Sequence, residues 1–162
     1  MREAVRAGVP ACLKLSSELK VAPNDVLTLS LSGPTKLTGT LIAGGAGRIE
    51  ARFTVRKAGE YELEVRDSDG ETLLRDTLLV RAGPVHTASC TPLPSADPLV
   101  LVLQARDAHG NAVRCGGASF SAALAGVGAA KGGERPVRDR RDGTYEIELV
   151  GAPGACGAPR AL

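Results

Sequence analysis

Aromatic residues are scarce in this sequence, and tryptophan is absent. The aromatic side chains of the 162-residue chain are Phe53, Tyr61, Phe120 and Tyr145. A core of this composition is filled mainly by Leu, Val, Ile and Ala, which bury less area per residue than aromatic side chains. Proteins that hold single-stranded nucleic acid usually stack its bases on aromatic rings, so the scarcity argues against a nucleic-acid partner.

Charge of one sign and long apolar runs are also missing. The 20 basic and 18 acidic residues give a net charge of +2, which offers no electrostatic case for a polyanionic partner. No apolar run approaches the roughly 20 residues of a membrane-spanning helix, so we expect no membrane insertion. Residues 1–6 lack the hydrophobic region of a signal peptide, which would favour the cytoplasm unless the chain is an excised piece of a longer protein.

The cysteines form no metal-ligand pattern. Cys12, Cys90, Cys115 and Cys156 are all more than five residues apart, whereas zinc ligands usually come in close pairs. Four cysteines allow three pairings, and a sequence alone does not choose between them. Free thiols and one or two disulfides, with Cys12–Cys90 or Cys115–Cys156 as candidates, both stay open.

Catalytic motifs are absent as well. Neither His86 nor His109 has an acidic or thiol partner at an informative spacing, and no nucleophile elbow, phosphate loop or zinc-protease motif occurs. Glycine-rich residues 44–47 join two predicted strands without a helix N-terminus to hold an anion. Residues 67–70 have oxygen ligands at calcium-like spacing but lack the distal Glu, so we interpret them as a turn. We expect no enzymatic activity, no cofactor, no metal and no small-molecule substrate.

What the chain does have is strict alternation of apolar and polar residues, clearest in residues 48–65. The apolar positions there are Ile49, Ala51, Phe53 and Val55 in a first arm and Tyr61, Leu63 and Val65 in a second. A period of two predicts strands with one apolar face. We expect these two strands, joined by a short segment containing Gly59, to be neighbours on one face of a sandwich.

Similar short alternations, separated by Gly, Pro and Asp, recur along the chain and favour an all-β fold. Residues 82–84 (Ala-Gly-Pro) predict a boundary, and the recurrence predicts tandem domains at 1–83 and 84–162. Residues 1–10 are interpreted as a frayed lead-in. The predicted strands cover residues 12–19, 26–31, 36–42, 48–55, 60–65 and 72–80 in the first domain, and 85–90, 99–105, 118–124, a short edge strand at Val137 and 144–150 in the second.

Several motifs, in this order and spacing, resemble filamin-type immunoglobulin-like repeats. Residues 101–111 resemble the second strand of the family and its Asp-x-x-Gly-Asn loop, and residues 142–145 resemble the Asp-Gly-Thr-Tyr that opens its fifth strand. In the first domain, residues 32–35 (Ser-Gly-Pro-Thr) and residues 58–61, which open the sixth strand, match the family in the same way. The resemblance implies two consecutive immunoglobulin-like β-sandwiches.

The sequence also departs from this family. The first domain lacks the Asp-x-x-Gly-Asn loop, and residues 74–77 replace the usual Gly-Ser-Pro-Phe of the last strand. After Val150 the second domain has no alternating sixth strand, so we expect its C-terminal strands to be incomplete or irregular. The chain end at Leu162 is interpreted as that of a fragment.

The resemblance implies a structural or protein-interaction role. We expect a non-catalytic fragment of a larger cytoskeletal or ciliary scaffold protein, which contacts protein partners or neighbouring domains of the same chain. The alternatives are an extracellular adhesion module of the gamete-adhesion type and an accessory domain of a larger enzyme. The expected location is accordingly the cytoplasm, the cytoskeleton or the cilium, with an extracellular location as the alternative.

In several filamin-type repeats, the exposed third and fourth strands accept a partner peptide as an added strand. An open sheet edge offers unpaired N–H and C=O groups for such an addition. The alternative is that these edges are solvated or covered by a neighbouring unit. Residues 135–142, with four arginines and two aspartates, are read as a solvated edge or as a docking site for an acidic partner. The partner-binding residues that the resemblance implies are Lys36, Leu37, Thr38, Thr40, Ser119, Phe120, Ser121, Ala122, Val137 and Arg138.

Overall fold

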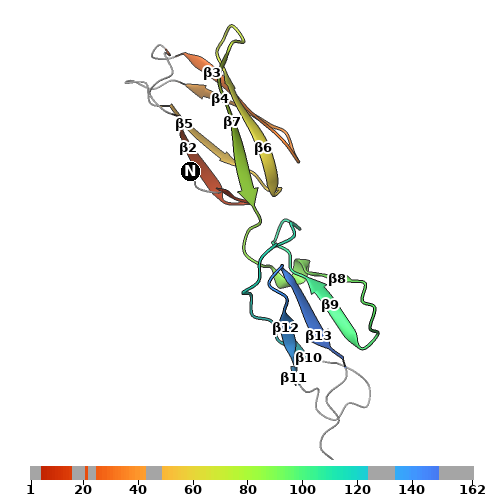
Figure 1. The fold of residues 1–162 in the computed structure, drawn as a ribbon. Coiled ribbons are helices and arrows are strands. Elements are labelled where there is room, and N and C mark those ends of the chain that lie inside the picture. The colour runs from red at the N-terminus through yellow and green to blue at the C-terminus, as the bar shows by residue number, and fades with distance from the viewer. Residues whose placement is uncertain (1–4, 16–20, 22–24, 43–48, 124–133, 150–162) are drawn as a thin grey trace, which may run out of the picture. The chain divides into compact units, whose positions relative to one another are not determined.

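The computed structural model describes residues 5–15, 21, 25–42, 49–123 and 134–149 (Figure 1). These ranges contain thirteen strands and one short 3-10 helix, which confirms the predicted all-β fold. No helix within them is long and apolar enough to cross a bilayer. Internal contacts divide the chain into two compact units, Met1–Pro84 and Val85–Leu162.

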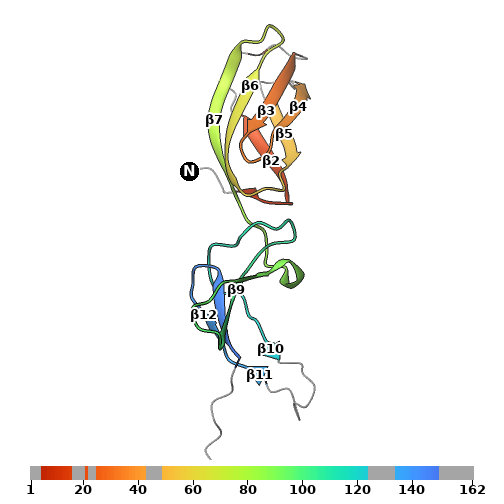
Figure 2. The same cartoon turned by 90° about the vertical axis from the view of Figure 1, so that its right-hand side faces the viewer.

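The first unit consists of two sheets (Figures 1 and 2). The β1–β7 pair of the larger sheet is parallel, and every other pairing in the two sheets is antiparallel. The larger sheet has the order β1-β7-β6-β3-β4, with β1 at Val5–Arg6, β3 at Val26–Ser32, β4 at Leu37–Ile42, β6 at Gly59–Arg66 and β7 at Thr72–Arg81. The smaller sheet pairs β2 (Pro10–Leu15) with β5 (Ile49–Thr54).

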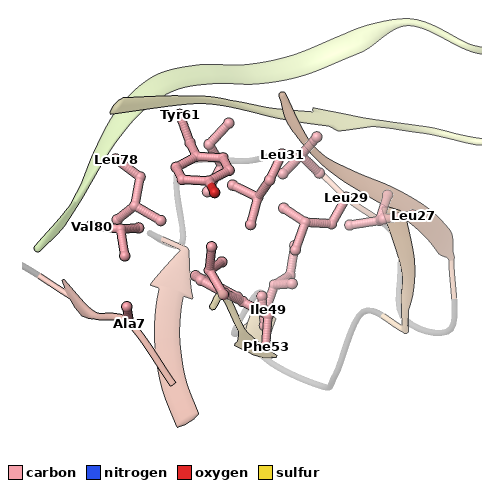
Figure 3. Packing of buried hydrophobic residues seen from close by; sticks show 13 residues of the cluster. Ala7, Leu27, Leu29, Leu31, Ile49, Phe53, Tyr61, Leu78 and Val80 are labelled. Atoms are coloured by element: carbon pink, nitrogen blue, oxygen red, sulfur yellow. The ribbon is translucent and has the colours of Figure 1, made fainter. Parts of the chain in front are cut away.

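A single apolar cluster fills the space between these sheets (Figure 3). Alternate residues of β3, β5 and β6 are buried, as their period of two requires. Tyr61 on β6 is fully buried, and its ring lies across the cluster from Ile49 and Phe53 on β5. The two sheets therefore form a sandwich, with a core of Leu, Val, Ile and Ala around a few aromatic rings.

The predicted pairing of the two arms in residues 48–65 is wrong. β5 pairs only with β2 among the described strands, whereas β6 pairs with β3 and β7. Residues 55–58 carry the chain from one sheet to the other, and the N–H of Gly8 donates to the carbonyl oxygen of Val55 at 2.8 Å. Alternation identifies the apolar face of a strand but not its partner, so two strands that face each other across a core give the same pattern as two neighbours.

The lead-in prediction for residues 1–10 is also wrong in part. Val5 and Arg6 form β1, which pairs in register with Val80 and Arg81 of β7. The N–H of Ala7 donates to the carbonyl oxygen of Arg81 at 2.8 Å, and Ala7 is buried. Two residues are too few to show a period. The strand predicted at 12–19 begins earlier, at Pro10, and residues 16–19 lie outside the described ranges.

The second unit has a four-stranded antiparallel sheet of order β12-β13-β9-β8. A separate short pair joins β10 (Ala122–Ala123) to β11 (Glu134–Arg135). In the larger sheet, Tyr145 and Ile147 are buried on β13, as predicted from their alternation with Glu146 and Glu148. Its strands are β8 (Thr91–Leu93), β9 (Val100–Gln104), β12 (Val137–Asp139) and β13 (Thr144–Glu148).

Two strands predicted in this unit do not form as expected. Residues 87–89 are a 3-10 helix, closed by a 2.9 Å contact between His86 Nδ1 and Ser89 Oγ, and residues 91–93 supply the strand. Residues 118–121 are not a strand, because the N–H of Ala118 donates to the Tyr145 hydroxyl at 3.0 Å. Only residues 122–123 of the predicted 118–124 strand pair with another strand, and residues 124 and 150 lie outside the described ranges.

The Asp-x-x-Gly-Asn loop is a structural turn built on a buried carboxylate. Asp107 is 1% exposed, and its Oδ1 accepts the N–H groups of His109 and Asn111 at 2.9 Å each. The Asn111 side-chain amide donates to Asp107 Oδ2 at 2.8 Å, and Gly110 takes φ of 78°. These bonds satisfy the buried oxygens and fix the loop. Asp107 therefore stabilises this turn, and its backbone also bridges to Val85.

Candidate functional site

The structure places the predicted partner-binding residues on three different segments. Leu37, Thr38 and Thr40 lie on β4 of the first unit, with the exposed Lys36 directly before it. In the second unit, Val137 and Arg138 lie on β12, whereas Ala122 lies on β10 in another sheet. Since Ser119, Phe120 and Ser121 are outside any strand, they do not meet the geometry of a strand-addition site. The Phe120 ring instead packs on Tyr145, with centroids 4.5 Å apart.

β4 is the last strand of the larger sheet in the first unit. Its register with β3 sets Leu37 opposite the buried Leu31, and Leu41 opposite the buried Leu27. Leu37 and Leu41 therefore lie on the core face, yet both are only half-buried. Half-burial at core-facing positions shows that the apolar face is incompletely covered at this edge.

The opposite face of β4 presents hydroxyl groups. Thr38 lies opposite Ser30 and Thr40 lies opposite Thr28, and both threonines are exposed. Among the described strands β4 pairs only with β3, so its outward-pointing donors and acceptors have no described sheet partner, and they lie beside small polar side chains.

Gly39 occupies the centre of β4 and leaves space beside it. It lies opposite the buried Leu29 on the core face, and a Cβ built there meets no atom within 4 Å. The sequence predictions did not include this residue. Its signal is a glycine in the middle of an alternating run, which often marks a close approach of another backbone.

A network of charged side chains on the same sheet lies on β6 and β7. The Glu64 carboxylate lies 3.0 Å from guanidinium nitrogens of both Arg75 and Arg66, and it accepts the Thr72 hydroxyl at 2.9 Å. The bond from Arg75, followed by those from Thr72 and Arg66, lowers the pKa of Glu64, and the same contact raises the pKa of Arg75. A shallow hollow over this network is lined by Glu60, Glu62, Arg75, Asp76 and Thr77. Because Arg75 is already paired with Glu62 and Glu64, the hollow carries no uncompensated guanidinium for a ligand.

The edge of β7 is blocked by one of its own side chains. The carbonyl oxygen of Arg81 accepts the N–H of Ala7, which directly follows β1, so the backbone groups of Arg81 point to the outer edge. By the period of two, those of Thr77 point the same way. Asp76 lies opposite the buried Leu63, and its Oδ1 accepts the Thr77 N–H at 2.7 Å. A charged residue on the inner face of an edge strand opposes the addition of another strand. This residue, too, was missed by the sequence predictions, although it interrupts the apolar alternation of β7.

The edges of the second unit are short and carry proline or charge. Of the three residues in β8, one is Pro92, which has no N–H to donate. β12 is equally short and contains Arg138 and Asp139. Both Asp139 oxygens are engaged, Oδ2 by the Gly117 N–H and Oδ1 by the Arg141 N–H, each at 2.7 Å. Such residues protect an edge from further pairing.

The basic run 135–142 is partly neutralised within the second unit. Glu146 on β13 pairs with both Arg138 and Arg140, and these contacts, Arg140 first, lower the pKa of Glu146. The contact also raises the pKa of Arg140. Two of the four arginines in the run therefore share one carboxylate. Docking of an acidic partner here stays a prediction.

Among the described strands longer than two residues, β4 is thus the only one at a sheet edge that contains neither charge nor proline. The smaller sheet of the first unit carries Lys14 on β2 and Glu50 and Arg52 on β5. β4 reads Leu-Thr-Gly-Thr-Leu-Ile throughout.

The cysteines and histidines form no cluster in the described part of the chain. Cys12, Cys90 and Cys115 are free thiols, and Cys156 lies outside the described ranges. No group of three or more His, Cys, Asp or Glu side chains in these ranges could hold a metal ion.

No protein-family model matches the chain, and no curated protein matches it. Among solved structures, a candidate glycoside hydrolase from Bacteroides vulgatus is 18% identical, with a TM-score of 0.42 over 70% of this chain and 22% of that one. Invasin, a bacterial integrin-binding protein, is 14% identical, with a TM-score of 0.33 over 88% of this chain and 34% of that one. The chain therefore spans about a third or less of either neighbour. At these TM-scores, neither similarity carries an argument about the fold, family or function of this chain.

Proposed function

We propose that the chain is a non-catalytic β-sandwich module that binds protein partners by strand addition at β4. The observation that supports this proposal is a contrast between sheet edges. β7, β8 and β12 each contain a residue that opposes strand pairing, whereas β4 contains none. Edge strands usually carry such protection because an open edge recruits other chains. A six-residue edge without it is suited to recruiting one.

The chemistry of β4 supports recognition of an extended segment. Main-chain hydrogen bonds to the open edge would supply affinity without regard to sequence. Selectivity would come from the core face, where the space at Gly39 lies between the half-buried Leu37 and Leu41. An apolar side chain of the added strand would enter this space.

An immunoglobulin-like topology forms part of the proposal. In the first unit, a sheet of order β1-β7-β6-β3-β4 packs against the β2–β5 pair. The buried Tyr61 donates its hydroxyl to the carbonyl oxygen of Lys57 at 3.0 Å, four residues upstream, a bond that resembles the tyrosine corner of immunoglobulin-like domains. Membership of the filamin-type repeats, and a place in a cytoskeletal or ciliary scaffold, rest on the motif resemblance alone and are proposed with it.

The test places an inward-facing carboxylate on β4, like that of Asp76 on β7. Gly39→Asp places a carboxylate on the core face of the edge, and the open space at this position lets it fit. Gly39→Ala is the matched control, since it changes the same residue without adding charge. Random peptides are selected from a phage-displayed library on the full chain and mapped by backbone amide NMR.

We expect the selected peptides to shift the amides of residues 37–42, to bind the Gly39→Ala variant and to lose binding to Gly39→Asp. Shifts confined to other strands, or equal binding to Gly39→Asp, would overturn the proposal. So would a selection that yields no binding peptide.

A further inference from the structure

We propose that one occupant of the β4 edge is β4 of a second copy of this chain, paired antiparallel about a two-fold axis at Gly39. The inference rests on the proposed function, since it uses the same open edge. The partner that it names for this edge is the same strand of a second copy.

The sequence of β4 carries the symmetry. Leu37-Thr38-Gly39-Thr40-Leu41 reads identically in both directions. In an antiparallel pair centred on Gly39, Leu37 faces Leu41 of the second copy and Thr38 faces Thr40. In a closed two-fold dimer each contact occurs twice, once on either side of the axis, so the Leu37–Leu41 and Thr38–Thr40 pairs would each form twice.

The side chains fit such a pair on both faces. On the outer face, the exposed Thr38 and Thr40 would form threonine–threonine cross-strand pairs, which stabilise antiparallel sheets. On the core face, the half-buried Leu37 and Leu41 would gain apolar cover from the same residues of the second copy. At the axis, the two Gly39 residues would face each other, and a Cβ at this position meets no atom within 4 Å in the single chain.

The lack of charge on β4 removes one obstacle to self-pairing at this edge. Like charges that face each other across an antiparallel pair destabilise it, and none face each other when β4 pairs with a second β4. β4 has no charged residue, whereas Asp76 would stand against an added strand at the β7 edge. The pair is small beside a standard interface of about 1,600 Å², so we expect a weak dimer that dissociates on dilution.

The register is tested by two double variants at exposed outer-face positions. Thr38→Lys with Thr40→Lys sets like charges opposite each other in the dimer. Thr38→Lys with Thr40→Glu sets each introduced lysine opposite an introduced glutamate of the other copy, but only if the axis passes through Gly39. Sedimentation velocity of the full chain gives the dissociation constants, and circular dichroism confirms that each variant is folded.

We expect the double-lysine variant to dimerise at least about tenfold more weakly than the unaltered chain, and the lysine–glutamate variant to stay within about threefold of it. Equal weakening of both variants would overturn the register. Dimerisation that is unchanged in the double-lysine variant would place the interface elsewhere.

A cross-link provides a test that does not depend on added charge. In a chain whose four native cysteines are replaced by serine, Gly39→Cys sets two thiols opposite each other at the axis. Opposed Cα atoms of an antiparallel pair lie about 4.5–5.5 Å apart, within the range of a disulfide. We expect oxidation to give a covalent dimer from Gly39→Cys and not from Thr38→Cys, whose two copies are displaced from the axis. The reverse result would overturn the inference.

These outcomes separate the inference from the proposed function. A chain that stays monomeric, while library peptides still bind at residues 37–42, would end the self-pairing and leave strand addition intact. A chain that neither dimerises nor binds any peptide at β4 would end both.

Discussion

Asp76 Oδ1 accepts the backbone N–H of Thr77 at 2.7 Å, on the outer edge of β7. The bond satisfies a donor that another strand would otherwise use, and the carboxylate adds a charge that an approaching strand would have to desolvate. The edge of β7 is therefore closed by a local interaction between two neighbouring residues.

Removing the Asp76 carboxylate should open the β7 edge to another strand. In a Gly39→Asp background, where β4 is blocked, we expect Asp76→Val to produce oligomers that grow with protein concentration in light scattering. Asp76→Asn is the matched control, since it removes the charge and keeps a carbonyl acceptor for Thr77. In the same background, the Asp76→Asn variant should associate more than the protein that keeps Asp76 and less than the Asp76→Val variant. A monodisperse Asp76→Val protein at high concentration would show that Asp76 does not guard this edge.

The hydroxyl of Tyr61 stabilises the crossing from β5 to β6. It donates to the carbonyl oxygen of Lys57 and lies 3.0 Å from Thr35 Oγ1. We expect Tyr61→Phe to lower the free energy of unfolding by about 1–2 kcal/mol, because the buried ring is kept while a part-buried carbonyl loses its donor. Thr35→Ala removes only the second contact and should cost less. Urea denaturation measures both, and equal effects would contradict the role of the Lys57 bond.

Two glycines with similar backbone angles should respond differently to alanine. Gly143 and Gly110 have φ of 88° and 78°, but a Cβ at Gly143 would lie 1.7 Å from the carbonyl oxygen of Val113, whereas one at Gly110 meets nothing within 4 Å. We expect Gly110→Ala to cost about 1–2 kcal/mol from backbone strain alone. Gly143→Ala should cost about 3 kcal/mol or more, since the loops must move apart. Similar losses in thermal or urea unfolding would contradict the close approach.

The ion pairs of Glu64 make the stability of the first unit depend on pH. The pKa of Glu64 lies below its ordinary 4.5 in the folded chain, so the unfolded chain binds more protons as pH falls. The stabilisation is present above pH 4.5 and is lost as pH drops through the folded pKa. We expect the urea midpoint of the first unit to fall in this range, and Glu64→Gln to flatten that part of the profile. A profile that Glu64→Gln leaves unchanged would show that other carboxylates dominate.

The second unit supplies the comparison for this pH experiment. The pKa of Glu146 is lowered in the same direction by Arg140 and Arg138, so its contribution has the same sign. The pKa of Asp142 is lowered too, by its bonds to Thr144. Glu146→Gln should therefore flatten the unfolding profile of the second unit and leave that of the first unchanged. If each variant altered the profile of the other unit, the two would not unfold independently.

The faces of the long strands could be predicted from the sequence, because burial on one side imposes a period of two. Residues 49–54 and 59–66 alternate as expected, and their apolar members are buried. Their partners could not be predicted in the same way. The chain crosses between sheets at residues 55–58, and alternation contains no information about a sheet change.

Short elements escaped prediction for a different reason. β1 has two residues and is held by pairing to β7 and by the burial of Ala7, which are tertiary effects. Residues 118–121 have a strand-like composition, but Ala118 and Phe120 are engaged by Tyr145 instead.

The candidate site was predicted in part. The family resemblance identified Leu37, Thr38 and Thr40 as residues of an edge, and the structure places them on one. Gly39 and Asp76 acquire their significance only from comparing edges, which requires the sheet order. The alternation of residues along one strand does not say whether that strand lies at the edge or the centre of its sheet.

The parallel pairing of β1 with β7 has a mechanical consequence. β1 begins the described chain of the first unit, and β7 ends at Arg81, close to the last residue of that unit. When tension is applied between the start of one parallel strand and the end of the other, the strands are drawn past each other lengthwise. The hydrogen bonds that join them, including that from Ala7 to Arg81, are then loaded together rather than opened one after another. The first unit would therefore resist stretching through the few hydrogen bonds between β1 and β7, and these bonds would break together.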